Sequence, residues 1–407
     1  MREISIPKSR SFKGNITLEE KNLEAESVKA PEIVSGWRKS WVRLKFKWTL
    51  LRILRRCYKN PLDWIHGLQY LAKRRRSILG NHRIRKLVKV EGHFYMDLYV
   101  PGWNDVANEQ FIFSELSHFK THHEKVNRFN QVFLSITKKC PMQCEHCSAW
   151  ETLNMKDLLG ADEFGRIIKD VHQMGFSQLY FTGGEPMVKF HLLESLITQL
   201  PIEVKSWVAT SGFQLTQERA QLLKKAGLTG VFISLDHYEK ERHNTFRNHT
   251  AAYFWALEAA RNALDAGLLV TYSVCLNDDI CRREELLKYM DFAKNCGVHF
   301  VQFLEPQSVG RYKNRNVSLS KESVSSAEAL YLEMNYGKDY LEYPLIHYLG
   351  YYHRRIGCFG GGKQVIYIDA DGNLNACPFC QASKGNLLEG SIREKVDALA
   401  LNGCELF

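Results

Sequence analysis

Apolar and polar positions follow two different periods along this chain, and the change between them predicts how it folds. Between residues 37 and 79 large apolar residues recur at helical spacing, at Trp41, Leu44, Trp48, Leu51 and Leu54. Basic residues surround that stripe and Pro61 interrupts it, which predicts one or two basic amphipathic helices. Residues 84–100 alternate around Gly92, as a short β-hairpin does.

From residue 131 the pattern becomes a regular succession of strands and helices. Strands are expected near residues 131–137, 178–181, 203–209, 230–234, 269–275 and 299–304. Helices are expected near residues 161–174, 190–199, 216–226, 251–266, 284–296 and 320–333. Such repeats imply parallel strands joined by right-handed crossovers, and six units make a partial barrel because a closed one needs eight.

The predicted fold class is therefore α/β. It is a partial (β/α)6 TIM-like barrel with a basic helical N-terminal extension and a small cysteine-rich C-terminal β-hairpin module. Four segments are expected: a flexible lead (1–36), basic amphipathic helices with a short hairpin (37–130), the barrel (131–310) and the C-terminal module (311–407).

Charge is concentrated in the N-terminal third of the 407 residues. Residues 1–130 carry 26 Lys and Arg against 13 Asp and Glu, and residues 37–89 carry 17 against the single Asp63. No apolar run approaches the roughly 18 residues of a membrane-spanning helix, and no signal-peptide stretch opens the sequence. A cytoplasmic protein is expected, peripheral on the inner face of the membrane if the basic segment binds lipid.

Eleven cysteines without an export signal favour metal ligation over a disulfide scaffold. Three of them, Cys140, Cys144 and Cys147, lie within eight residues directly after the first barrel strand. Three thiolates suit a [4Fe–4S] cube and leave one iron open to a small molecule. The alternative is a structural zinc site, with His146 as its fourth ligand.

The second barrel strand ends in Gly183, Gly184, Glu185 and Pro186, where two glycines allow a ligand to approach the backbone. The three cysteines followed by this GGEP turn resemble the radical S-adenosylmethionine (SAM) superfamily over residues 130 to 310. The resemblance implies that the cysteines hold a [4Fe–4S] cluster with an open iron site. It also implies that the turn binds the amino group of SAM, and that SAM is cleaved to a 5′-deoxyadenosyl radical.

Later strand ends continue the resemblance. It implies that Ser211 contacts the ribose, that Ser234 contacts SAM hydroxyls or its carboxylate, and that Arg247 neutralises the carboxylate. The alternatives are a strand-end cap for Ser234 and a surface salt bridge for Arg247. No residue is predicted to be a general base or a radical relay.

The second group of cysteines lies near the C-terminus, at Cys358, Cys377 and Cys380. A strand, an Asp-Gly turn and a returning strand are expected to bring them together. The pattern resembles a shortened SPASM/twitch module and implies a second, auxiliary Fe–S cluster, with Cys404, water or substrate as its fourth ligand. A zinc hairpin is the alternative.

Three functions remain open for this sequence. The first is radical SAM chemistry on a membrane-associated lipid or isoprenoid, because residues 37–89 suit an anionic membrane surface. The second is the same chemistry on a ribosomal peptide or protein side chain. The third is a non-catalytic Fe–S or zinc protein that binds RNA or membrane, with nucleic acid ranked below membrane. The radical chemistry implies an electron donor such as flavodoxin or ferredoxin.

Overall fold

The computed structural model describes residues 31–358, 360–380 and 382–402. Most of the predicted flexible lead, residues 1–30, lies outside the described residues, as does Cys404. The end of that lead was wrongly predicted, because β1 (Glu32–Val34) pairs antiparallel with β2 and buries Val34. The alternation of a short strand is too brief here to stand out in the sequence.

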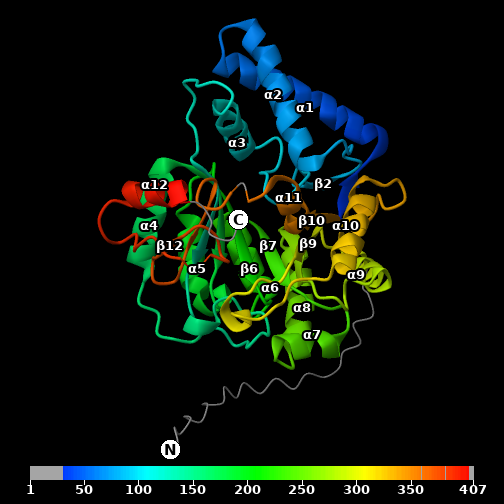
Figure 1. Cartoon of the computed structure of the whole chain (residues 1–407), viewed down its shortest axis with the longest axis vertical. Helices are drawn as coiled ribbons and strands as arrows, with labels where there is room; N and C mark the ends of the chain where they lie inside the picture. The colour runs from blue at the N-terminus through cyan, green and yellow to red at the C-terminus, as the bar shows by residue number, and fades with distance from the viewer. Residues whose placement is uncertain (1–30, 359, 381, 403–407) are drawn as a thin grey trace, which may run out of the picture.

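The N-terminal region is a pair of long helices and a small sheet, joined to a third helix (Figure 1). Its elements after β1 are α1 (Gly36–Cys57), α2 (Pro61–Leu79), β2 (Leu87–Val90), β3 (His93–Tyr95) and α3 (Val106–Ser117). The predicted hairpin is β2–β3, whose turn places Glu91 and Gly92 at positive φ. Ile53 and Leu54 of α1 are fully buried against α3, so this region has a core of its own.

Six parallel strands form the centre of the main sheet, as predicted. They are β4 (Phe129–Ser135), β5 (Phe176–Thr182), β6 (Lys205–Thr210), β7 (Leu228–Ser234), β8 (Leu269–Cys275) and β9 (Phe300–Leu304). Neighbouring strands in the sheet are also consecutive in the sequence, which is the strand order of a (β/α) barrel. The partial barrel is therefore confirmed.

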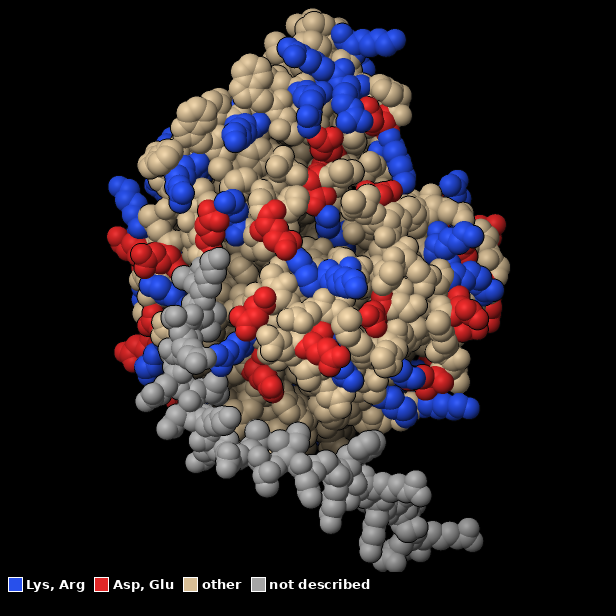
Figure 2. Space-filling model, turned by 180° about the vertical axis from the view of Figure 1, so that it is seen from behind, with Lys and Arg blue, Asp and Glu red and all other residues tan. Residues whose placement is uncertain are grey.

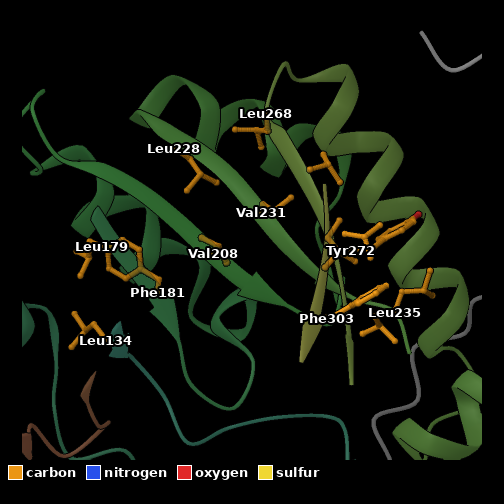
Figure 3. Close-up of a cluster of buried hydrophobic side chains, with 14 of the residues drawn as sticks. Leu134, Leu179, Phe181, Val208, Leu228, Val231, Leu235, Leu268, Tyr272 and Phe303 are labelled. Carbon is orange, nitrogen blue, oxygen red and sulfur yellow. The ribbon is translucent and has the colours of Figure 1, made fainter. Parts of the chain in front are cut away.

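Helices cover the outer face of the sheet. They are α4 (Ala161–Met174), α5 (Phe190–Thr198), α6 (Gln217–Ala226), α7 (Lys240–Arg247), α8 (Ala252–Asp265), α9 (Arg283–Asn295) and α10 (Lys321–Tyr336). Figure 3 shows the apolar layer beneath them, in which Leu179, Val208 and Val231 point from successive strands. Short 3-10 turns lie at η1 (Trp150–Thr152), η2 (Pro186–Lys189) and η3 (Gly310–Tyr312). The helix α7 was not predicted, because its eight residues are almost all polar.

The inner face of the sheet is covered by the N-terminal region instead. Tyr180, Trp207 and Phe232 point inward from three strands and pack against Val88 and Tyr95 of the hairpin. Lys86, just before the hairpin, is buried and donates hydrogen bonds to the carbonyl oxygens of Tyr340, Tyr343 and Pro344. The extension is thus fastened to the barrel interior and does not project as a free arm.

The C-terminal segment extends the same sheet at both edges. It consists of β10 (Leu345–Tyr348), α11 (Leu349–Ile356), β11 (Val365–Ile368), β12 (Leu374–Asn375) and α12 (Ile392–Asn402). β10 pairs in parallel with β9, and β11 pairs in parallel with β4, so the sheet has nine strands in the described part of the chain. The expected hairpin around the Asp-Gly turn is β11–β12. No described helix is long and apolar enough to cross a membrane.

Candidate functional site

The first cysteine loop leaves the C-terminal end of β4 and brings its three thiols together. Cys140, Cys144 and Cys147 form one small cluster with Met142 and Ala252. Burial raises the pKa of the Cys140 thiol to about 12 and that of Cys147 to about 11. Such thiols stay protonated on their own and become thiolates when a metal supplies positive charge, which fits a metal-binding loop.

The double-glycine turn lies directly against this loop. The amide of Gly184 donates to the carbonyl oxygen of Thr137 at 2.7 Å, and that of Glu185 donates to Lys139 at 2.8 Å. A Cβ on Gly183 would lie 2.5 Å from the Thr137 oxygen, and one on Gly184 would lie 2.4 Å from the Lys139 oxygen. The turn therefore requires glycine for close packing against the loop.

The Glu185 carboxylate joins the ends of two strands. It is 1% exposed and accepts hydrogen bonds from the amides of Met187 and Ser211 and from the hydroxyls of Thr210 and Ser211. Burial raises the pKa of this carboxyl, although the four donors oppose the shift. Both oxygens are used within the protein, so any contact of this turn with SAM is left to its backbone.

A buried ion pair between Arg247 and Asp236 contacts the cysteine loop. Arg247 Nε lies 2.6 Å from Asp236 Oδ2, and its Nη1 donates to Cys144 Sγ at 3.5 Å. The other oxygen of Asp236 accepts from the Cys275 amide. Burial by itself would raise the pKa of Asp236, but Arg247, the two neighbouring histidines His146 and His243 and the Cys275 amide together outweigh it, so the pKa is lowered. Arg247 is thus buried, and its predicted alternative as a surface salt bridge is wrong.

One cavity of about 1460 Å³ connects these groups with distant parts of the chain. At one end it is bordered by the three cysteines, the double-glycine turn, Ser211, Ser234 and Arg247. At the other end it passes between α1 and α2, where apolar and basic side chains alternate: Arg43, Phe46, Lys47, Leu50, Leu71, Arg75 and Ile78. The residues predicted to hold the cluster and SAM, except Pro186, therefore line one cavity, which α1 and α2 also line.

A histidine–aspartate pair on the cavity wall was missed by sequence reasoning. His347 of β10 is 3% exposed, and its Nδ1 lies 3.1 Å from Asp97 Oδ1 in an ion-pair contact. Neither ring nitrogen has a hydrogen-bond partner of good geometry among the described residues. Nε2 can therefore hydrogen-bond to a molecule bound in the cavity. The two residues are 250 positions apart, and only the packing of the hairpin segment against β10 brings them together.

The C-terminal cysteines border the same cavity. Cys358 and Cys377 line it, and Cys380 is buried, with its amide donating to the Cys377 carbonyl oxygen. Among the described residues, no three His, Cys, Asp or Glu side chains converge on a single metal-ion position. A cube of irons takes one thiolate per iron, so its ligands need not converge, and the thiol-only donor set fits such a cluster.

Comparison with known proteins identifies the central part of the chain. Residues 134–290 match the radical SAM superfamily. This region is a radical SAM domain. A radical SAM domain uses a [4Fe–4S] cluster and SAM, and the C-terminal cysteine pattern of this chain fits an auxiliary cluster of SPASM type. The roles of individual residues stay predictions.

Relatives with assigned activities match about half to two thirds of this chain. The PqqA peptide cyclase of Granulibacter bethesdensis is 27% identical over 266 residues, 64% of this chain and 70% of the relative. The GTP 3',8-cyclase of Helicobacter pylori is 30% identical over 192 residues, 44% of this chain and 59% of the relative. The chain spans between 50% and 70% of the length of the curated relatives it matches.

Solved structures share the radical SAM fold at low identity. SuiB of Streptococcus suis bound to the precursor peptide SuiA covers 72% of this chain and 69% of its own, with a TM-score of 0.53 and 13% identity. The anSMEcpe protein with bound AdoMet covers 68% of this chain and 80% of its own, with a TM-score of 0.53 and 17% identity. At these identities the likeness concerns the fold.

Proposed function

We propose that this radical SAM enzyme abstracts hydrogen from an amphiphilic substrate, a lipid or isoprenoid with an anionic end, that it takes from an anionic membrane surface. The observation that carries the proposal is the single cavity that runs from the cysteine loop to the gap between α1 and α2. An apolar body would lie along Phe46, Leu50 and Leu71, with its anionic end near Arg43 and Lys47.

When bound, the cluster and SAM would supply the one-electron cleavage of SAM to methionine and a 5′-deoxyadenosyl radical. The residues of this chain would bind the cluster and SAM and enclose the site of reaction. Cys140, Cys144 and Cys147 would hold the cluster, and the 183–186 turn with Ser211 and Ser234 would hold SAM. The buried side chains around the cysteine loop would limit the access of water to the radical. A small electron-transfer protein such as flavodoxin or ferredoxin would deliver the electron, and the C-terminal cysteines would hold the auxiliary cluster.

The membrane part of the proposal rests on an outward face of α1. Trp37, Trp41, Leu44 and Trp48 lie at i, i+4, i+7 and i+11 and are 73%, 60%, 46% and 64% exposed. They form one stripe, opposite the α1 face that lines the cavity. The apolar stripe predicted from the sequence therefore does not lie on a single face of α1. Its first residues are exposed, whereas Leu54 points inward and is buried. Exposed tryptophans beside basic residues suit the interface of an anionic bilayer.

Charge on the surface agrees with that orientation. Figure 2 shows Lys and Arg gathered over the upper end of the molecule, where Figure 1 places α1 and α2. Each basic residue near an anionic bilayer contributes about 1 kcal/mol. The partner is therefore a surface rich in anionic lipid, and binding should weaken as salt rises.

Radical chemistry is tested by anaerobic reconstitution with iron and sulfide, followed by SAM and dithionite. Wild-type protein should release 5′-deoxyadenosine and methionine, and Cys144→Ala should not. Cys57→Ala is the matched control, because Cys57 lies in the α1–α3 core away from the cavity lining. Absence of 5′-deoxyadenosine from iron-loaded wild-type protein would remove the proposal.

Membrane binding is tested by flotation on phosphatidylcholine vesicles with and without phosphatidylglycerol. Burying an aromatic side chain is worth about 1.5–3 kcal/mol, so each of Trp41→Ser and Trp48→Ser should weaken binding about tenfold. Leu401→Ser is the control, because Leu401 is 88% exposed on α12. Equal flotation of all four proteins would contradict the membrane assignment.

A peptide substrate is the second candidate, favoured by the comparisons. One relative is named a PqqA peptide cyclase, and one structural neighbour is bound to a precursor peptide. A short peptide encoded beside this gene should then bind the reconstituted enzyme and become modified in the presence of SAM. Modification of such a peptide without vesicles would favour this candidate over the lipid.

A further inference from the structure

Arg247 touches a predicted cluster ligand in a way that its expected role toward SAM does not explain. It is the last residue of α7, a short helix packed along the first cysteine loop. The preceding residue, Phe246, accepts a hydrogen bond from the Glu145 amide at 3.0 Å and stacks on the His146 ring with centroids 4.8 Å apart. The end of α7 is therefore fastened to the loop at Glu145 and His146.

The position of the Arg247 guanidinium is fixed by its contact with Asp236. Asp236 binds its Nε at 2.6 Å, and that carboxylate is itself held by the Cys275 amide. His243, from the same helix, accepts a hydrogen bond from the Asp236 amide through Nδ1. Arg247 is buried and positioned by its partner, with Nη1 directed at Cys144 Sγ.

A cation in hydrogen-bond contact with a cluster thiolate favours the more negative state of that cluster. Reduction adds one electron and no bond forms or breaks, so the added charge is stabilised by the nearby positive charge. Hydrogen bonds to the sulfur atoms and net charge are among the terms that set Fe–S potentials. The Asp236 carboxylate acts in the opposite direction, but it contacts the guanidinium at Nε, whereas the sulfur is contacted directly by Nη1.

We propose that Arg247, positioned by Asp236, donates an N–H to the Cys144 thiolate and raises the reduction potential of the [4Fe–4S] cluster at that loop. The proposal rests on the assignment of Cys144 as a cluster ligand under the proposed function. It gives the ion pair a redox role, separate from any contact between Arg247 and SAM.

Two variants should shift the potential in opposite directions. Asp236→Asn removes the compensating anion and leaves the cation, so the midpoint potential should rise. The double variant Asp236→Asn/Arg247→Gln removes both charges and weakens the hydrogen bond to sulfur, so the potential should fall. A shift of 59 mV corresponds to a tenfold change in the reduced-to-oxidised ratio of a one-electron couple, and we expect shifts of about this size.

The measurement is a redox titration of the reconstituted full-length protein without SAM, monitored by electron paramagnetic resonance. Arg242→Gln is the control, because Arg242 lies on the same helix in an exposed pair with Glu239 and should leave the potential unchanged. Iron content and circular dichroism verify that each variant holds its cluster and folds.

The outcomes separate the possibilities. Opposite shifts support the proposal. Unchanged potentials in iron-loaded variants, or shifts of the same sign in both, overturn it. If the double variant loses its cluster, Asp236→Asn alone decides, because asparagine matches aspartate in shape and a fall or no change contradicts the proposal. Failure of wild-type protein to make 5′-deoxyadenosine is a separate result, which removes the proposed function and leaves the measured shifts intact.

Discussion

The two ends of the cavity are built in different ways. At the cysteine-loop end, backbone groups make the contacts: the 183–186 turn hydrogen-bonds to the loop, and glycine hydrogens leave no room for a Cβ. At the α1–α2 end, the lining consists of side chains from two helices held by their own small core. The first end therefore tolerates little change of sequence, whereas the second can change its lining without altering the fold.

The largest expected effect comes from disrupting the cysteine-loop end of the cavity. Gly184→Ala would place a Cβ 2.4 Å from the Lys139 oxygen and force the cysteine loop away from the turn. Bound iron and 5′-deoxyadenosine formation should both fall severely, by about a hundredfold for the product, since a misplacement of about 1 Å costs that much. Gly165→Ala, with free space in α4, is the matched control and should keep full activity.

The next largest effect concerns the attachment of the N-terminal region, which contains the α1–α2 end of the cavity, to the barrel. Lys86→Met leaves up to three carbonyl oxygens around residues 340–344 without their donor. We expect a loss of about 3 kcal/mol in the free energy of unfolding, measured by urea denaturation. Arg83→Met, which changes a less buried cation of the same segment, should lose much less. Equal losses would mean that Lys86 does not anchor the hairpin.

The pH dependence of stability tests the main sheet, on which both ends of the cavity rest. His299 is buried before β9, its Nδ1 accepts a hydrogen bond from the Val270 amide, and burial lowers its pKa to about 4. Between pH 6.5 and 4 the unfolded chain binds the extra proton, so stability is complete above 6.5 and is lost as the pH falls. The loss should be about 2 kcal/mol between pH 7 and pH 5.

The check is the difference between wild-type protein and His299→Gln, because other histidines titrate in both. Urea unfolding of the two proteins at pH 7 and pH 5 should show the smaller loss in the variant. Identical pH dependence in the two proteins would contradict a neutral His299 in the fold.

The smallest expected effect sharpens the description of α1. Trp41→Ser should change the free energy of unfolding by no more than about 0.5 kcal/mol, because the side chain is exposed. Leu54→Ala, on the opposite face of the same helix, should cost about 2–5 kcal/mol because Leu54 is fully buried. A large loss for Trp41→Ser would show that the outward stripe serves folding.

Local sequence patterns determined the barrel and the positions of its cysteines. All six predicted strands and six predicted helices of the barrel region are present, with ends shifted by three residues or fewer. Strands that are covered on both faces read as nearly continuous apolar runs, and the regular alternation of such runs with amphipathic helices is a strong signal. The cysteine loop and the double-glycine turn follow consecutive strands, so their proximity is a consequence of parallel topology.

Tertiary structure alone decided what encloses that site. The short polar helix α7, the pairing of β11 with β4 and the seating of the hairpin inside the barrel carry no local periodic signal. The meeting of His347 with Asp97, and of Arg247 with Cys144, depends on residues more than 100 positions apart. The apolar pattern within a helix or strand shows which of its faces is apolar. It does not show which distant segment of the chain will cover that face.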